Sequence, residues 1–176
     1  FENGPDLAIE TLKEVKKQVP NTTLQIIGGG KQNLERLKLL TQKLGLEKDV
    51  LFHGFVLDNN DMAAMVRKCY LALAPYRALP QSVRWYADAT KIRQYLASGL
   101  PVVTTQVPPL GKVVADKGAA LVAKDNIQAY AKAIVKLLQD KNLYIKFEKK
   151  ARELSAENTW EHEYEKAFKT MSEYEK

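Results

Sequence analysis

Cysteine is nearly absent from this sequence, which has Cys69 alone among its 176 residues. A single thiol excludes a disulfide within the chain and a cysteine-rich metal site, and it favours a reducing compartment. Long apolar runs are absent too: no stretch approaches the roughly 20 residues that cross a bilayer, and no signal-peptide pattern opens the chain. We therefore expect a soluble protein of the cytoplasm.

Charge of one sign is not concentrated anywhere. Lys and Arg number 27 against 21 Asp and Glu, a net charge of +6, but both signs mix along the chain, as in Lys13-Glu14 and Glu148-Lys149. No basic run alternates with aromatic residues as a groove for single-stranded nucleic acid requires, so we expect no nucleic-acid partner. The small basic excess favours an anionic ligand or a peripheral contact with a membrane surface, although a solvated surface explains it more simply.

Apolar periodicity predicts one domain in which strands alternate with helices, because the chain is long enough for one sizeable core and too short for two. Strands are predicted at residues 22–27, 50–53, 70–74, 101–105 and 119–123. Helical spacing predicts helices that include residues 8–19, 34–44, 62–69, 90–98, 109–116, 127–138, 147–154 and 160–171. This alternation is typical of an α/β fold, a Rossmann-like open parallel sheet with helices on both faces, which binds ligands at the carboxyl ends of its strands.

Two segments depart from this alternation. The chain opens directly into a helix at Pro5, so we expect the sheet to lack its usual first strand or to borrow it from residues outside the sequence. The segment from Pro75 to Asp88 has neither a helical nor a strand period. Long irregular loops in compact domains are usually functional or disordered, so this one is predicted to border the ligand cleft and to be mobile without ligand.

Glycines follow the first two predicted strands. Gly28-Gly29-Gly30 would let a ligand approach the backbone at a helix N-terminus, which favours negative charge, but a tight turn explains these residues equally well. The pattern is not GxGxxG, which argues against the alternative of a nicotinamide-dependent Rossmann enzyme. His53 lies beside Gly54 with no triad or metal spacing around it, so a structural role is favoured over a general base. His162 is expected on the surface.

The most informative stretch is residues 88–103, D-A-T-K-I-R-Q-Y-L-A-S-G-L-P-V-V. It resembles the retaining glycosyltransferases of the GT-B fold, in which a helix of the type K-x-x-E-Y-L-A-x-G-x-P-V-V runs into a buried strand. The matching residues are Lys91, Tyr95, Leu96, Ala97, Gly99, Pro101, Val102 and Val103. The resemblance extends over nearly the whole chain, with further matches at residues 4–7 (K-G-x-x), 24–30 (L-x-I-x-G-x-G), 50–56 (V-x-F-x-G-x-V) and 158–161 (S-W-E).

The resemblance implies that residues 1–176 form the carboxyl-terminal, nucleotide-sugar-binding domain of a group 1 glycosyl transferase, with an acceptor-binding domain upstream. It implies transfer of a sugar from a nucleotide-diphosphate carrier to an acceptor hydroxyl, without a metal or other cofactor. The implied donor-binding residues are Gly28, Gly29, Gly54, Phe55, Val56, Asp88, Thr90, Lys91 and Gln94. Among them, Thr90 and Lys91 would hold the diphosphate and Gln94 the ribose, with Phe55 and Val56 beside the base and the two glycines near the sugar.

Physical chemistry supports the phosphate assignment independently. The first turn of the helix at Thr90 has free N–H groups at the carboxyl edge of the sheet, where the ammonium of Lys91 joins them. The simpler alternative is that Lys91 is a solvated residue of the first turn.

The sequence also departs from the family pattern. The family places an acidic residue at each end of an E-x7-E motif, and this chain has Tyr86 and Gln94 there. Many members have a phosphate-binding Lys where this chain has Asn3. No catalytic residue is assigned, and a module that binds nucleotide sugars without transferring them is the alternative.

Overall fold

The computed structural model describes residues 2–157 and 159–174, and in the last helix it describes the side chains of 164, 165 and 167–172. The elements follow in the order α1 (Pro5–Lys16), β1 (Leu24–Ile27), α2 (Lys31–Leu44), β2 (Val50–Gly54), α3 (Asn59–Arg67), β3 (Ala72–Ala74), the 3₁₀ turn η1 (Val83–Trp85), α4 (Thr90–Ala97), β4 (Val102–Thr105), α5 (Pro109–Asp116), β5 (Ala120–Ala123), α6 (Ile127–Gln139), α7 (Lys141–Glu157) and α8 (Trp160–Tyr174). The predicted alternation of strands and helices is confirmed.

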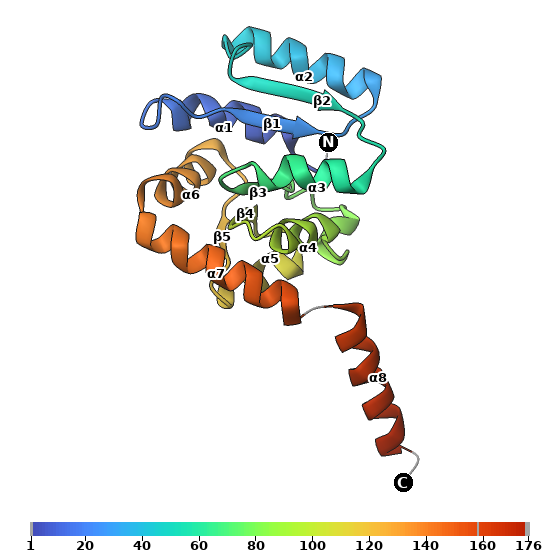
Figure 1. The fold of residues 1–176 in the computed structure, drawn as a ribbon. Coiled ribbons are helices and arrows are strands. Elements are labelled where there is room, and N and C mark those ends of the chain that lie inside the picture. Colours follow the sequence, from blue (N-terminus) through green and yellow to red (C-terminus); the bar gives the residue numbers. More distant parts are fainter. Residues whose placement is uncertain (1, 158, 175–176) are drawn as a thin grey trace.

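All strand pairs are parallel, but the strands form two sheets. One sheet has the order β1-β2 and the other the order β3-β4-β5. Figure 1 shows the two groups apart, with β1 and β2 above the other three strands. The predicted α/β class is therefore confirmed, with its sheet divided between β1 and β3.

The chain enters its first helix without a preceding strand. Residues 2 and 3 form a turn that leads directly into α1, and they add no strand to either sheet. Among the described residues, no strand lies between β1 and β3. The described residues thus lack this strand, as predicted, and a strand borrowed from residues outside the sequence stays a prediction.

Several element ends differ from the sequence-based boundaries. Val19 and Cys69 lie beyond the ends of α1 and α3. At the end of α3 the backbone leaves the α-helical pattern, because the Cys69 N–H bonds to the carbonyl of Val66, three residues back, at 2.9 Å. The third strand covers only Ala72–Ala74 and omits Tyr70 and Leu71. These two residues follow α3 beside the gap, where one side of the strand has no neighbour to extend the ladder.

Helices cover both faces of the larger sheet, with β4 at its centre. All four β4 residues are buried. Val102 packs in a cluster with residues of α4, α5 and α7, including Ile92, Val114 and Leu154. Val103, which points to the opposite face, packs in a second cluster with residues of α1 and α6, including Tyr130. A third cluster joins α1 and α2 to the smaller sheet.

The last helix, α8, extends away from both sheets in Figure 1. Its side chains Tyr164, Phe168 and Met171 are exposed. The side chain of His162 lies outside the described residues, so its expected surface position stays a prediction. In the described part of the chain, no helix combines the length and apolar character that crossing a membrane requires.

The side chain of Tyr130 predicts a measurable contribution to stability. Its hydroxyl, fully buried, donates a hydrogen bond to the Val103 carbonyl at 2.6 Å. Tyr130→Phe removes this buried hydrogen bond and should lower the free energy of unfolding by about 1–2 kcal/mol. Urea unfolding measures this change, with Tyr70→Phe as control because Tyr70 is exposed and stacks on Tyr144 through its ring. Equal stability of the two variants would contradict the prediction.

Candidate functional site

The predicted site residues lie at one edge of the molecule, because every strand is parallel and each loop after a strand emerges at the carboxyl end. Four of them, Gly28, Gly29, Lys91 and Gln94, line one cavity of about 1060 Å³. The other five, Gly54, Phe55, Val56, Asp88 and Thr90, are in the neighbouring loops and the α4 N-terminus but outside that lining.

The turn between β1 and α2 requires glycine. Gly28 and Gly29 both have φ of 101°, which side chains rarely tolerate. The Gly28 N–H donates to the Gly54 carbonyl at 2.6 Å and ties this turn to the end of β2. A Cβ atom at Gly28 would meet nothing within 4 Å, so the backbone here faces open space. Gly30 precedes α2 with no side-chain cap, and the first amides of that helix are therefore open to a ligand.

The loop after β2 presents an apolar surface. Phe55 is 75% exposed, and Val56 is half-buried. Asp58 ends the loop by capping α3, since its carboxylate accepts the N–H groups of Asn60 and Asp61. His53 Nε2 lies 3.1 Å from Gln25 Oε1 on the neighbouring strand, which agrees with the structural role favoured from sequence.

Helix α4 begins at the same edge with an uncapped N-terminus. Ala89 precedes it and offers no side-chain hydrogen bond, and Thr90, its first residue, is exposed. Asp88 does not cap the helix; its carboxylate pairs with Arg93 at 2.8 Å. The Ile92 N–H donates to the Ala89 carbonyl at 2.8 Å, and no side chain caps the first turn of α4.

Lys91 belongs to a cluster with two residues that the sequence did not single out. Its Nζ lies 5.9 Å from the centroid of the Tyr76 ring, and Arg84 Cζ lies 5.9 Å from the same centroid. Tyr76 is only 2% exposed and supports both cations from beneath. Among the described residues, no carboxylate lies within 4.0 Å of Lys91 Nζ, and Arg84 has a single one, Glu2, at 3.6 Å.

Burial and charge repulsion act together on this cluster. Burial lowers the pKa of Lys91, and the nearby Arg84 guanidinium lowers it further, since both disfavour the protonated form of the Lys91 amine. Burial also raises the pKa of the Tyr76 hydroxyl. An anion placed between Lys91 and Arg84 would restore the charge balance that this arrangement lacks, so the cluster is suited to bind a phosphate group.

The loop from Pro75 to Asp88 positions Arg84. Asp125 holds the start of the loop, because its carboxylate accepts the Ala78 N–H at 2.7 Å and lies 3.3 Å from Arg77 Nε. Further along, the Ser82 hydroxyl accepts the Arg84 N–H at 3.1 Å and begins the η1 turn. Tyr76, within this loop, lines the cavity beside Lys91. The position of the loop at the donor cleft and its mobility stay predictions.

The two positions of the acidic motif are solvent-facing. Tyr86 is 90% exposed, directly after η1. Gln94 is exposed on α4, and it lines the large cavity one helical turn after Lys91. Neither side chain brings charge to the site. No three His, Cys, Asp or Glu side chains gather into a metal-binding group within residues 2–157 and 159–174.

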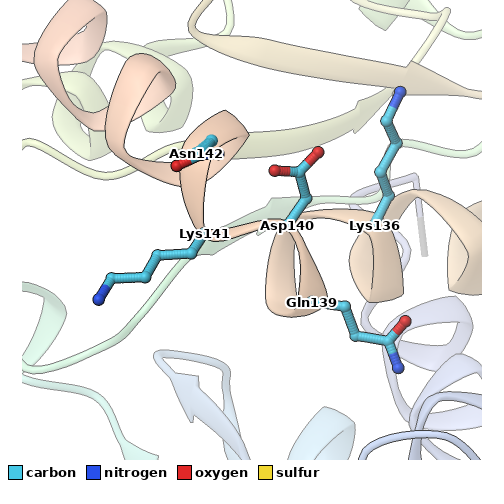
Figure 2. Close-up of a pocket in the computed structure, with 5 residues that line it drawn as sticks. All are labelled: Lys136, Gln139, Asp140, Lys141 and Asn142. Atoms are coloured by element: carbon cyan, nitrogen blue, oxygen red, sulfur yellow. The ribbon is translucent and has the colours of Figure 1, made fainter.

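A second hollow of about 500 Å³ lies at the corner between α6 and α7 (Figure 2). Lys136 and Lys141 point away from each other in this view, and Asp140 accepts the Leu143 N–H at 2.9 Å to begin α7. The corner follows the end of α6, at the amino edge of the sheet. It is therefore opposite the edge where the candidate site lies.

Comparisons with known proteins agree with this geometry. The family described as glycosyl transferases group 1 matches residues 1–154. A GDP-mannose-dependent phosphatidylinositol monomannoside mannosyltransferase of Mycolicibacterium smegmatis is 28% identical over 149 residues, which are 78% of this chain and 36% of that protein.

Solved structures share the fold. WaaG, a glycosyltransferase of lipopolysaccharide biosynthesis, has a TM-score of 0.74 at 23% identity and covers 89% of this chain and 40% of its own. The C-terminal domain of LpcC from Francisella tularensis has a TM-score of 0.74 at 20% identity, over 88% of this chain and 78% of that domain. Anabaena HepE in complex with UDP has a TM-score of 0.74 at 20% identity, over 89% of this chain and 41% of HepE.

The cluster predicts how Lys91 titrates. Arg84→Gln should raise the pKa of Lys91 toward its ordinary value, because it removes the repulsion. The rise should be incomplete, since burial, the larger cause, remains. NMR titration of lysine labelled at Cε measures this, with Arg93→Gln as control because Arg93 pairs with Asp88 instead. If the pKa of Lys91 is unchanged in Arg84→Gln, the two cations do not interact, and the proposed cluster is wrong.

Proposed function

Because the chain belongs to the glycosyl transferases group 1 family, we propose that its carboxyl-edge site binds a nucleotide-diphosphate sugar for transfer to an acceptor hydroxyl. The observation that carries this proposal is the pair of Lys91 and Arg84 over the buried Tyr76 ring, beside an uncapped helix N-terminus. Two partly buried cations and uncapped helix amides are groups that would hold a diphosphate.

The diphosphate is proposed to contact Lys91, Arg84 and the backbone N–H groups at Thr90. During transfer the bond from the sugar to the diphosphate breaks, and negative charge builds on the leaving phosphate oxygen. Cations and amides that are already fixed in place stabilise this charge without reorganisation, which is often the largest contribution to catalysis. Asp88, neutralised by Arg93, would support the start of α4 from outside the phosphate site.

The rest of the donor is proposed to extend along the same edge. The Gln94 amide would hydrogen-bond the ribose hydroxyls, and Phe55 with Val56 would contact the base. Gly28 and Gly29 would let the sugar approach the backbone; a Cβ atom at Gly28 would meet nothing within 4 Å, whereas one at Gly29 would lie against the Leu34 side chain. HepE, similar in fold, has been solved with UDP and with UDP-glucose, which supports a nucleotide-sugar ligand for this site.

The acceptor is proposed to bind a second domain of the full-length protein, upstream of this chain. The chain spans 36% of the mannosyltransferase and 40% of WaaG, which leaves room for such a domain in proteins of that length. A cytoplasmic setting with peripheral membrane contact belongs to the same proposal. The net charge of +6 supports it, because basic surfaces are attracted to anionic lipids.

A second candidate function is donor binding without transfer. It is favoured by the uncharged Tyr86 and Gln94 at the two positions that are acidic in the family. Incubation of the full-length protein with UDP- and GDP-sugars, with and without glycan and lipid acceptors, separates the two functions. Acceptor-dependent release of nucleoside diphosphate indicates a transferase, and binding with no release indicates a binding module.

Substitution of Lys91 tests the diphosphate site. Lys91→Ala removes a charge-assisted contact of about 1.5–3 kcal/mol, so the affinity for UDP or GDP should fall roughly tenfold to a hundredfold. The corresponding nucleosides should bind almost unchanged, because the contact is to phosphate. Calorimetric titration of the full-length protein at fixed ionic strength measures both affinities.

The control for this experiment is Lys112→Ala, which removes an exposed lysine of α5 that pairs with Asp116. It should leave both affinities unchanged. If Lys91→Ala binds nucleoside diphosphates as tightly as the wild type, Lys91 is a solvated helix-start residue, and the phosphates bind elsewhere, with Gly28-Gly29-Gly30 as the next candidate.

Substitution of Phe55 tests the base site and gives the opposite pattern. Stacking of a base on an aromatic ring contributes about 1–3 kcal/mol, so Phe55→Ala should weaken nucleoside and nucleoside diphosphate by the same factor, roughly fivefold to a hundredfold. Leu57→Ala is the matched control, because Leu57 is an apolar residue two positions later and is also exposed. If Phe55→Ala weakens only the binding of the nucleoside diphosphate and not that of the nucleoside, the base does not contact Phe55.

A further inference from the structure

Asp125 is a buried carboxylate that serves no element of its own. It lies between β5 and α6, and its side chain is only 14% exposed. The cap of α6 is the next residue, Asn126, whose side chain accepts the Ala129 N–H at 2.9 Å. A buried carboxylate destabilises a protein unless hydrogen bonds or an opposite charge compensate it. The partners of Asp125 therefore show what it does.

Those partners are two consecutive residues of the Pro75–Asp88 loop. Asp125 Oδ2 accepts the N–H of Ala78, which lies 47 positions earlier in the chain, at 2.7 Å. Asp125 Oδ1 lies 3.3 Å from Arg77 Nε, and the Arg77 guanidinium also lies 3.9 Å from the Asp6 carboxylate on α1. One backbone amide and one side chain at the start of the loop are thus held from the start of α6 and from α1.

The segment that follows, residues 79–87, folds back on itself. The Ser82 N–H donates to the Leu79 carbonyl at 3.0 Å, and the Trp85 Nε1–H donates to the same carbonyl at 2.8 Å. The Arg84 N–H then donates to the Ser82 hydroxyl at 3.1 Å. Among the described residues, no hydrogen bond from this segment reaches another part of the protein. The Arg84 backbone is therefore tied to the start of the segment and moves with it.

The Arg84 side chain has few contacts that fix its direction. Its Nε lies 3.6 Å from a Glu2 carboxylate oxygen, beyond hydrogen-bonding distance, and this buried N–H has no hydrogen-bond partner among the described residues. Its other contact is with the Tyr76 ring. Two apolar side chains of the loop also pack on the core beneath, but apolar contacts are not directional. The direction of the guanidinium therefore depends on the backbone that Asp125 holds.

We propose that Asp125 is a positioning residue for Arg84. By holding the start of the loop, it sets the orientation that brings the Arg84 guanidinium to the Tyr76 ring beside Lys91. Asp125 is not among the residues that line the large cavity, so it acts only through the loop. The placement of Arg84 needs no ligand, and the proposal rests on the proposed function only where the diphosphate is concerned.

The pKa of Lys91 reports the position of Arg84, since the Arg84 charge lowers it. Asp125→Ala frees the loop, so Arg84 should move away and the pKa of Lys91 should rise toward its value in Arg84→Gln. Loss of a carboxylate by itself has the opposite sign, because it disfavours the protonated lysine. A rise in Asp125→Ala therefore comes through Arg84, and the double variant should show no further rise. NMR titration of lysine labelled at Cε measures these values in the full-length protein without ligand.

Asp140→Ala is the matched control for this titration. The Asp140 carboxylate also accepts a backbone N–H, that of Leu143 at 2.9 Å, but at the corner between α6 and α7. Asp140→Ala should leave the pKa of Lys91 unchanged. An unchanged or lowered pKa of Lys91 in Asp125→Ala would overturn the proposal.

A conservative variant keeps the test sharp if Asp125→Ala does not fold. Asp125→Asn retains an oxygen that can accept the Ala78 N–H, but it loses the charge that holds Arg77. The pKa of Lys91 should therefore rise in Asp125→Asn as well, by less than in Arg84→Gln. A pKa of Lys91 at or below that of the wild type in Asp125→Asn would overturn the proposal in the same way.

Nucleoside diphosphate binding tests the same link through the ligand. Asp125→Ala should weaken the binding of UDP or GDP roughly threefold to thirtyfold in the wild-type background and should have no effect in the Arg84→Gln background. A purely structural role of Asp125 would instead lower the affinity by the same factor in both backgrounds. Calorimetric titration of the full-length protein measures the four affinities.

The two proposals fail in different ways in this experiment. Equal factors in the two backgrounds overturn the positioning role of Asp125 and leave the donor site standing. If the wild type binds neither UDP nor GDP, the donor site is wrong, and the titration of Lys91 still decides whether Asp125 positions Arg84.

Discussion

The parallel direction of every strand is the constraint on which the site depends. Because the strands of each sheet share one direction, the turn at Gly28 and the loop at Phe55 emerge at the same end of the smaller sheet. Gly28 and Tyr76, which follows β3, line the same cavity. The same edge receives the N-terminus of α4, since a helix that follows a loop from a carboxyl end must begin there. β4 is buried between two helix layers, and this packing holds the strands of the larger sheet, from which the loops of the candidate site extend.

Electrostatics gives this edge its preference for an anion. Tyr76 is buried under two cations, and neither cation is fully neutralised by a carboxylate of the described residues. The lowered pKa of Lys91 reflects the same imbalance, because burial and the Arg84 charge both oppose its protonated form. A diphosphate would compensate both effects, which connects the geometry of the site to the family to which the chain belongs.

The sequence predicts the parts of this molecule that depend on periodicity and on local motifs. Alternating apolar runs identify the parallel α/β fold, and the stretch around Lys91 identifies α4 and the strand after it. Arg84 and Tyr76 were not predicted, because they lie in a segment without a period and meet Lys91 only through tertiary packing. The ends of α1 and α3 were placed too late, since Val19 and Cys69 keep helical spacing while the backbone has already turned. The helix start at Pro5 predicts that the sheet lacks a strand, and among the described residues none lies between β1 and β3.

A crystal structure of the protein with a bound nucleoside diphosphate tests the central claim most directly. The account predicts phosphate oxygens within hydrogen-bonding distance of Lys91 Nζ, of the Arg84 guanidinium and of the first N–H groups of α4. It also predicts a base beside Phe55. Phosphates bound instead at Gly28-Gly29-Gly30, with Lys91 and Arg84 facing solvent, would contradict it.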